Sequence, residues 1–246
     1  MISLSPEHSS IAPVAGLARR KLYGRRKGKP LRAAQVRLVE ELLPQVSVDL
    51  EVLDRDNNAA WKKEVFGRQV NHAWLEIGFG GGEHLAHQAV HNPGVGLIGC
   101  EPYLNGIAKL LHRIERDAVE NVRVHPGDAR DLIDRLPDQS VERVFVLYPD
   151  PWPKARHHRR RFMNVENLLP LARIMAPGTE LRLATDIPDY FEHALTAVAE
   201  CPDLFETAET IRAGGVASWP DWPGTRYEAK AVKAGRLPNY ATFRRI

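Results

Sequence analysis

Short β-prone runs alternate with helical segments through the middle of this chain, from about residue 73 to residue 199. The β-prone runs are at 73–77, 95–100, 122–125, 141–148 and 180–184. The helical segments between and after them are at 83–90, 104–119, 129–136, 165–175 and 190–199. Strands that alternate with helices are joined by crossover connections, which favour parallel pairing. The pattern predicts an α/β fold built on a doubly wound, Rossmann-like, mostly parallel sheet.

Further elements are expected on both sides of this alternation. Before it, 33–43 and 61–66 have helical spacing, and Pro44 is expected to end the first of these helices. After it, 205–246 is expected to form further strands joined by a loop rich in Gly, Pro and Trp. The chain has 246 residues, enough for one domain of this kind, which we place at 41–246.

Residues 1–40 carry a one-sided charge, although the net charge of the whole chain is only +3. No Asp or Glu occurs between His8 and Val39. The same span holds the cations Arg19, Arg20, Lys21, Arg25, Arg26, Lys27, Lys29, Arg32 and Arg37. Gly24, Gly28 and Pro30 argue against one continuous helix here. We expect a flexible arm that binds phosphate or nucleic acid, and the alternative is a solvated terminus with no partner.

Composition argues against several other classes of protein. The apolar runs are too short to cross a bilayer, and the first residues do not have the pattern of a secretory signal. Cys100 and Cys201 lie too far apart to form a metal or redox motif. We therefore expect a cytoplasmic protein with no membrane contact.

Three histidines have a spacing that a metal site on a helix could use. They are His84, His87 and His91, and no Cys or carboxylate completes a site with them. The apolar face of the same helix is expected at Leu85, Ala86, Ala89 and Val90. The sequence therefore predicts that the histidines face solvent, and that the protein holds no metal.

An acidic residue lies at or just past each of the five expected strand ends. These residues are Glu76, Glu101, Asp128, Asp150 and Asp186. Ligands of an open parallel sheet bind outside the carboxyl ends of its strands. A single Asp is also a common turn or cap residue, and a helix N-cap is the alternative role for Asp128. Five acids on one rim predict a ligand site.

The glycine-rich loop 78–82 decides which cofactor fits this rim. A dinucleotide fingerprint needs Gly or Ala at position 83, where this chain has Glu83. The carboxylate of Glu76 would repel a pyrophosphate but attract an ammonium or a sulfonium. S-adenosylmethionine carries both cations, and Gly78 and Gly80 would let the backbone approach it closely. The residues favour this cofactor, with S-adenosylhomocysteine as product, over an NAD(P) oxidoreductase.

The other strand-end acids suit the rest of that cofactor. Glu101 closes the second strand, where a carboxylate typically accepts hydrogen bonds from ribose hydroxyls. Asp128 and Ala129 close the third strand and are placed to meet the edge of the adenine.

The fourth strand ends in a stiff segment, Tyr148-Pro149-Asp150-Pro151-Trp152-Pro153-Lys154. Its prolines hold Asp150 in extended geometry beside the expected place of the methyl group. A carboxylate there would stabilise an N7-methylated purine, which is cationic. Trp152 could stack on a base or pack in the core. The cations that follow would hold phosphates or form a solvated turn, and they are Lys154, Arg156, Arg159, Arg160 and Arg161.

Three segments resemble the tRNA (guanine-N7-)-methyltransferase family. The loop at 75–82 is similar to its cofactor loop, which many methyltransferases share. The segment 149–161 resembles its highly specific signature, and 225–230 with Gly235 resembles its C-terminal substrate motif. The resemblance runs from about residue 67 to the end. It implies a class I methyltransferase fold, here with a basic N-terminal extension.

The resemblance implies methyl transfer from S-adenosylmethionine to N7 of a guanine in the tRNA variable loop, guanosine 46. It implies cofactor contacts from Glu76, Gly78, Gly80, Glu101, Asp128, Ala129 and Asp150. Asp150 is also the implied catalytic residue. Implied contacts to the target nucleotide come from Lys154, Asp186, Thr225, Arg226, Tyr227 and Glu228. Implied contacts to RNA come from Arg156, His157, His158, Arg159, Arg160 and Arg161.

One segment and one residue depart from the family pattern. The tail 237–240 lacks the Asp-containing pattern expected after Gly235, and Asp128 stands where relatives have Asn or Asp. The expected partner is tRNA, with no obligatory protein partner, for a monomer or a homodimer.

Two other readings stay open at this point. An exocyclic-amine RNA methyltransferase would also use an Asp-Pro-aromatic segment after the fourth strand, and mapping of the modified atom separates the two enzymes. A non-catalytic RNA-binding module would show no thermal stabilisation by S-adenosylmethionine.

Overall fold

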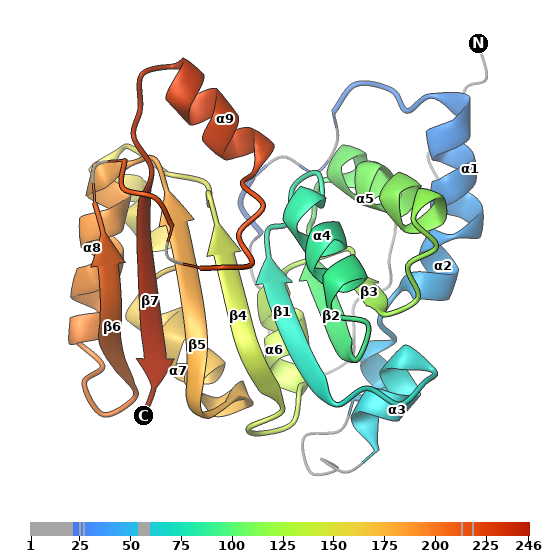
Figure 1. Ribbon diagram of the computed structural model, residues 1–246, viewed down its shortest axis with the longest axis horizontal. Coiled ribbons are helices and arrows are strands. Elements are labelled where there is room, and N and C mark those ends of the chain that lie inside the picture. The colour runs from blue at the N-terminus through green and yellow to red at the C-terminus, as the bar shows by residue number, and fades with distance from the viewer. Residues whose placement is uncertain (1–21, 25, 27, 54–59, 213, 218) are drawn as a thin grey trace.

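A computed structural model of the chain describes residues 22–24, 26, 28–53, 60–212, 214–217 and 219–246. Residues 1–21 of the expected basic arm lie outside the described residues. Within the described part, seven strands form one sheet in the order β3-β2-β1-β4-β5-β7-β6 (Figure 1). The strands are β1 (His72–Ile77), β2 (Val95–Cys100), β3 (Val122–His125), β4 (Val141–Leu147), β5 (Met175–Thr185), β6 (Phe205–Ile211) and β7 (Asn239–Arg245).

The first five strands pair in parallel, and β7 pairs antiparallel with both β5 and β6. The expected doubly wound, mostly parallel sheet is therefore confirmed. All five parallel strands end at the same edge of the sheet, so the acids that follow them share one rim.

Helices cover both faces of the sheet (Figure 1). They are α1 (Ala33–Glu41), α2 (Leu43–Val46), α3 (Trp61–Phe66), α4 (Glu83–His91), α5 (Leu104–Arg116), α6 (Ala129–Arg135), α7 (Val165–Ile174), α8 (Pro188–Ala199) and α9 (Arg226–Lys233), with the 3₁₀ turns η2 (Leu50–Val52) and η3 (Ala155–Arg160). One apolar cluster joins the sheet to α3, α6, α7 and α8. A second joins the other face to α1, α2, α4 and α5. In none of the described stretches is a helix long and apolar enough to cross a membrane.

Helix α5 shows why these residues form this element. Ile107, Leu110, Leu111 and Ile114 recur at helical spacing, and all four are buried. They make one apolar stripe that faces the sheet and α1, as expected for an amphipathic helix. The helix ends at Arg116, three residues before the expected 119, because Ala118 takes a left-handed φ of 49°.

Helix α1 ends at Glu41, before Pro44 as expected, and Pro44 stands in the first turn of the separate helix α2, where its missing N–H costs no hydrogen bond. Two other local expectations were wrong. Strand β5 begins directly at Met175, because Met175 pairs with Val141 before the register shifts. The chain between β6 and β7 contains α9, which alternation of strands and loops did not predict.

The described part of residues 22–32 runs along the beginning of α5. The N–H of Leu104 donates to the carbonyl of Arg26 at 3.1 Å. Asn105 accepts from the N–H of Gly28 at 2.9 Å and donates to the carbonyl of Lys29 at 2.7 Å. Leu38 of α1 is buried in the same apolar cluster as α5. The chain thus joins the folded body before residue 41.

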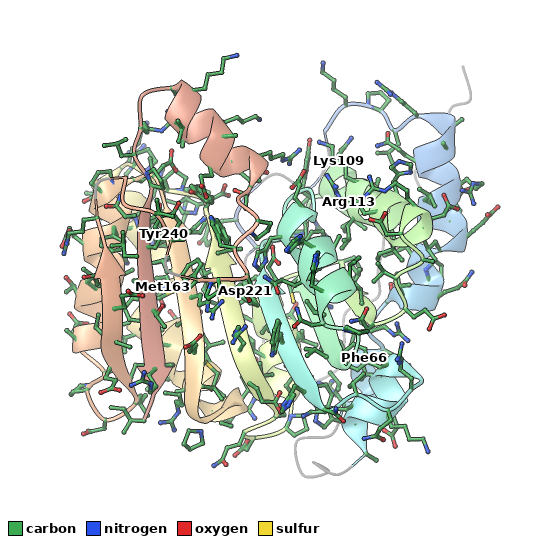
Figure 2. All side chains as sticks on the ribbon, in the orientation of Figure 1. Phe66, Lys109, Arg113, Met163, Asp221 and Tyr240 are labelled. Carbon is green, nitrogen blue, oxygen red and sulfur yellow. The ribbon has the colours of Figure 1, made fainter. Side chains whose placement is uncertain are left out.

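The loop before α9 crosses the front of the sheet (Figures 1 and 2). Trp219 is buried there with Phe145 and Tyr240. Asp221 accepts from Arg182 at 2.7 Å and from Arg143 at 3.2 Å. Aromatic packing and ion pairs therefore fix the segment that leads into α9.

Candidate functional site

Three carboxylates converge at the carboxyl ends of three neighbouring strands. Glu76 lies in β1, Glu101 just past β2 and Asp150 after β4, and β1 separates the other two strands. Burial, with a further contribution from the negative charges of Asp150 and Glu76, raises the pKa of Glu101 to about 7, although two backbone hydrogen bonds act to lower it. A cation bound among these groups would relieve their repulsion.

Glu101 fixes the glycine loop to the start of α5. Its carboxylate accepts from the N–H of Gly80 at 2.7 Å and from the N–H of Tyr103 at 2.9 Å. The loop and the helix are so close that a Cβ at Gly106 would lie 2.2 Å from the carbonyl oxygen of Gly80. Glycine is therefore required at position 106 for the loop to hold this shape.

Gly78 opens the loop toward solvent. It is exposed, its φ is 75°, and no atom lies within 4 Å of the place where a Cβ would stand. The backbone at the end of β1 thus borders free space, with Glu101 and Asp150 nearby. An open space lined by glycine backbone and carboxylates fits a cationic cofactor that carries ribose hydroxyls, such as S-adenosylmethionine.

Glu76 forms a buried pair with His84. Its Oε2 lies 2.7 Å from the Nδ1 of His84, and the two side chains are only 3% and 2% exposed. The expectation that His84 faces solvent was wrong. Gly82, with a φ of 71°, starts α4 in an orientation that turns His84 inward against Phe145, at 4.6 Å between ring centroids. Val90, expected to be apolar and inward, is 50% exposed.

In the part of the chain that the structure describes, no three His, Cys, Asp or Glu side chains are grouped so that they could hold a metal ion. His87 and His91 stack on each other with 4.0 Å between ring centroids.

Asp128 is the N-cap of α6. Its side chain accepts from the N–H of Arg130 at 3.0 Å and pairs with the guanidinium of Arg130 at 2.5 Å. A carboxylate at this end of a helix also interacts favourably with the helix dipole. The capping alternative for Asp128 is thus realised, and Ala129 follows it as the first, buried residue of α6.

Asp150 lies between two residues with left-handed backbone. The φ angles are 50° at Tyr148 and 43° at Trp152, and neither residue is a glycine. Asp150 is exposed, yet neighbouring protein atoms take water from its carboxylate and raise its pKa above the ordinary value.

Trp152 lies outside the three apolar clusters of the core. It is half-buried between Tyr23 and His157, with centroid distances of 6.1 Å and 6.0 Å. The guanidinium of Arg160 lies over the rings of both Tyr23 and Trp152, at 4.3 Å and 5.0 Å. The described start of the chain therefore covers the indole.

The basic residues after Trp152 divide into two groups. Lys154, Arg156 and Arg159 are exposed, and His157, His158 and Arg160 are partly buried. Arg161 is completely buried, donates to the carbonyl of Pro151 at 3.0 Å and pairs with Asp189. The expected RNA contact is not available to Arg161, because its guanidinium instead anchors the proline-rich segment to α8.

Helix α9 begins in the expected substrate motif. The hydroxyl of Thr225 accepts from the N–H of Glu228 at 3.1 Å. Thr-x-x-Glu is the spacing of a capping box, a sequence signal that predicts a helix start at this position. The ring of Tyr227 lies against the glycine loop, since a Cβ at Gly80 would be 2.7 Å from it. The motif therefore closes over the cofactor loop.

Glu228 is held by two residues that the sequence did not single out. The hydroxyl of Tyr148 donates to its carboxylate at 3.1 Å, and the indole N–H of Trp222 donates at 3.0 Å. Burial and the charge of Glu228 raise the pKa of Tyr148 above its ordinary value, so the phenol stays protonated as a donor. These bonds tie α9 to the end of β4, two residues before Asp150.

Asp186 lies at the end of β5 and is paired with a cation that follows α9. Its carboxylate is 2.5 Å from Nε of Arg236. The pair fixes the end of α9 to the rim, on the side away from the glycine loop.

Comparisons with known proteins agree with this geometry. A family model described as a putative methyltransferase matches residues 70–239. The tRNA (guanine-N(7)-)-methyltransferase of Paracoccus denitrificans (strain Pd 1222) is 51% identical over 231 residues, which are 92% of this chain and 95% of that protein. The protein of the same name from Rhodospirillum rubrum is 45% identical over 229 residues, 92% of this chain and 88% of that protein.

The chain belongs to the tRNA (guanine-N(7)-)-methyltransferase family. Solved structures show the same fold at much lower identity. A 16S rRNA methyltransferase, KamB, superposes with a TM-score of 0.55 at 16% identity, over 74% of this chain and 91% of that chain. An antibiotic-related methyltransferase superposes with a TM-score of 0.52 at 16% identity, over 75% and 92%. The chain therefore has the class I methyltransferase fold.

Proposed function

We propose that this protein transfers the methyl group of S-adenosylmethionine to N7 of a guanine in tRNA, guanosine 46 of the variable loop. The observation that carries the proposal is the convergence of Glu76, Glu101 and Asp150 beside the open loop at Gly78, in a chain whose relatives carry this name. The partner is tRNA, and we infer that the enzyme works in the cytoplasm.

The cofactor site uses the strand ends and the glycine loop. Gly78 and Gly80 bring backbone close to the ligand, and Glu101 accepts hydrogen bonds from ribose hydroxyls. The oxygen of Glu76 that is not bonded to His84 attracts the ammonium group. Asp128 and Ala129 bound the adenine at the end of β3.

Methyl transfer to guanine N7 needs little proton transfer by the protein. When bound, S-adenosylmethionine supplies an electrophilic methyl group on a sulfonium. Guanine N7 carries its own lone pair, so no side chain has to remove a proton from it. Asp150 accepts N–H groups of the base and stabilises the positive charge that the purine gains, while positioning in line supplies much of the rate.

The substrate site lies between the proline-rich segment and α9. We assign the target nucleotide to Lys154, Asp186, Thr225, Arg226, Tyr227 and Glu228. The phosphates nearest to η3 would be held by Arg156, His157, His158, Arg159 and Arg160. Tyr148 and Trp222 orient Glu228 through their hydrogen bonds, so we class them as positioning residues.

The test is incubation of the protein with unmodified tRNA and methyl-labelled S-adenosylmethionine, followed by nucleoside analysis. We expect the label in N7-methylguanosine. Label on an exocyclic nitrogen would establish an amine methyltransferase instead. Absence of both label and thermal stabilisation by S-adenosylmethionine would leave a non-catalytic RNA-binding module.

A further inference from the structure

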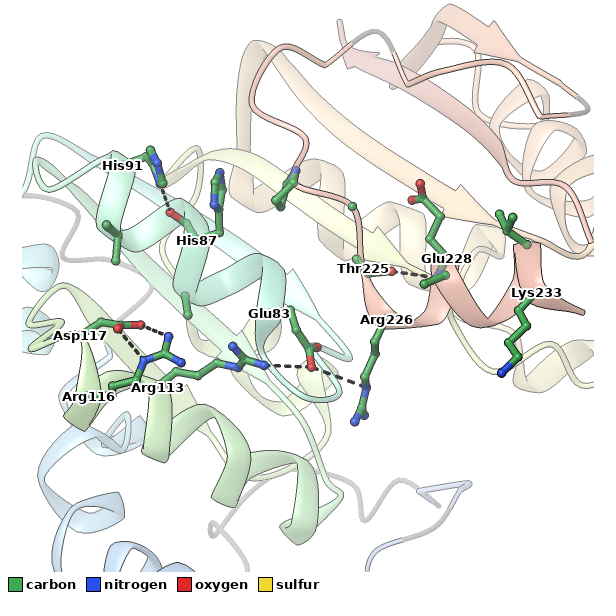
Figure 3. A pocket seen from close by; sticks show the side chains of 16 residues that line it. Glu83, His87, His91, Arg113, Arg116, Asp117, Thr225, Arg226, Glu228 and Lys233 are labelled. Carbon is green, nitrogen blue, oxygen red and sulfur yellow. Dashed lines mark hydrogen bonds and ion pairs between the residues drawn. The ribbon is translucent and has the colours of Figure 1, made fainter.

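A groove of about 1190 Å³ lies between α4, α5 and α9, next to the glycine loop (Figure 3). It is formed by residues of α4, the end of α5, the loop 223–225 and the outer turns of α9. Pockets for small ligands usually hold about 300–1,000 Å³. The size of this groove suits a segment of a polymer better than a small molecule.

Four cations gather where α5 and α9 approach each other. Lys109 and Arg113 belong to α5, on the part that lies toward α9, and Arg226 and Lys230 belong to α9 (Figure 2). We call these four residues the α5–α9 cluster. Arg113 and Arg226 share one carboxylate, Glu83, at 3.1 Å and 3.7 Å (Figure 3). The positive charge of the cluster therefore exceeds the negative charge at its centre.

Two observations show that the α5–α9 cluster is not internally satisfied. Nε of Arg226 is buried and has no hydrogen-bond partner, because 3.7 Å to Glu83 is too long for one. Loss of water around its ammonium group and the positive charges of Arg226, Lys230 and Arg113 lower the pKa of Lys109, although the negative charge of Glu83 acts to raise it. An anion placed between α5 and α9 would accept a hydrogen bond from Nε of Arg226 and would offset the excess positive charge around Lys109.

Arg113 and Arg226 line the groove, which also has an apolar and aromatic part. Val90 and Val232 are 50% and 55% exposed along it, beside the stacked rings of His87 and His91. Partial burial and the neighbouring His91 lower the pKa of His87, so its imidazole is neutral at neutral pH. The stacked rings of His87 and His91 and the aliphatic side chains offer a surface for an unpaired base.

We propose that the α5–α9 groove binds the sugar-phosphate backbone of tRNA next to the target guanosine, with the α5–α9 cluster on the phosphates. The proposal rests on the proposed function, because it supplies the RNA. Helix α5 follows β2 and α9 precedes β7, and the strands β1, β4 and β5 lie between those two in the sheet. RNA would thus be held on two sides of the site, at η3 and at this groove.

The test removes two charges that are not paired with Glu83. Lys109 and Lys230 are both exposed, so the double variant Lys109→Ala/Lys230→Ala should keep the fold. We expect its Kd for tRNA to rise about tenfold at moderate salt, and the slope of log K against log salt to fall by about 2. Its affinity for S-adenosylhomocysteine should stay that of the wild type. Each single variant should show about half of the change in slope.

The matched control is Lys63→Ala, an exposed lysine of α3 at the other end of the sheet (Figure 1). It should bind tRNA as the wild type does. An unchanged Kd and slope in the double variant would overturn the proposal. Weaker S-adenosylhomocysteine binding with normal tRNA binding would assign the cluster to the cofactor and overturn it as well. Formation of N7-methylguanosine by the wild type, measured separately, shows whether the proposed function itself holds.

Discussion

Asp150 is held in place by backbone that few residues adopt. The left-handed φ angles at Tyr148 and Trp152 each cost on the order of 1 kcal/mol, and such strain persists where the surroundings enforce it. Here the prolines, the buried Arg161 and the bond from Tyr148 to Glu228 enforce it. The segment presents one carboxylate at the end of β4 in a fixed orientation.

Replacing Asp150 by Asn should remove this charge while keeping the shape of the side chain. We expect the turnover number to fall by roughly 10²–10³, because the purine loses its counter-charge in the transition state. The Kd for tRNA should change little. Methyl transfer at saturating tRNA measures the first quantity and filter binding the second.

The control for Asp150→Asn is Asp203→Asn, an exposed carboxylate before β6. It should keep full turnover. Near-normal turnover in Asp150→Asn would show that the carboxylate has a structural role only.

Glu101 should make the stability of the free protein depend on pH. Its ordinary pKa of 4.5 is raised to about 7, so the folded protein keeps a proton that the unfolded chain has released. The contribution of Glu101 to the free energy of unfolding is fully present below pH 4.5. It is lost as pH rises through 7, a decrease of up to about 3 kcal/mol. Glu101→Gln cannot lose a proton. We expect the stability of the wild type relative to this variant to fall between pH 5 and pH 8, measured by urea unfolding.

The carboxylate of Glu101 should also make the affinity for the cofactor depend on pH. Only the ionised form accepts both ribose hydroxyls, so S-adenosylhomocysteine should bind more weakly at pH 6 than at pH 8. Glu120→Gln, an exposed carboxylate, should behave as the wild type in both measurements. A difference between wild type and Glu101→Gln that stays constant with pH would contradict the raised pKa.

The strand-end acids could be found from the sequence because parallel strands bring their carboxyl ends to one edge, and residue type then indicates the chemistry. The inward position of His84 and the burial of Arg161 could not. Both depend on which way a short element turns against the sheet, and local periodicity does not determine this. Tyr148 was missed because its partner Glu228 is 80 residues away in the sequence. Trp222 is close to Glu228 in the sequence, but it lies in the loop before α9, whose path local periodicity does not determine.

Among the helices and strands, α9 is the part of the site that the alternation of strands and helices did not predict. It lies between two antiparallel strands, where no crossover helix is needed, and its eight residues are mostly polar. The capping-box spacing from Thr225 to Glu228 was the available signal. The same four residues therefore serve two purposes, since they start a helix and bring Tyr227 over the glycine loop.

Loss of the cap should loosen α9 without unfolding the protein. Thr225→Ala removes the acceptor for the N–H of Glu228, which should cost about 1 kcal/mol locally, or roughly fivefold faster opening. Hydrogen exchange of the amides of residues 226–233 measures this. Thr225→Ser keeps the hydroxyl and should exchange as the wild type does. Equal exchange in Thr225→Ala would show that tertiary contacts alone hold the helix.

On the scale of the whole molecule, the C-terminal strands return the chain to the site. Strands β6 and β7 extend the sheet beyond β5, and the long connection between them crosses the sheet and ends in α9 above β1 and β4 (Figure 1). The proposed site therefore combines residues of the parallel strand ends with residues 225–228 from the C-terminal part of the chain. The sheet could be predicted from sequence, whereas this return path could not, because it depends on aromatic contacts of Trp219 and Trp222.

The central claim is that this assembly methylates N7 of one guanosine in the tRNA variable loop. The most direct measurement treats methylated tRNA so that the chain breaks at N7-methylguanosine, and then maps the break by primer extension. We expect a single break at position 46 after reaction with the wild type, and none when guanosine 46 is replaced by adenosine. Breaks at another guanosine, or a methylated tRNA that does not break, would contradict the account.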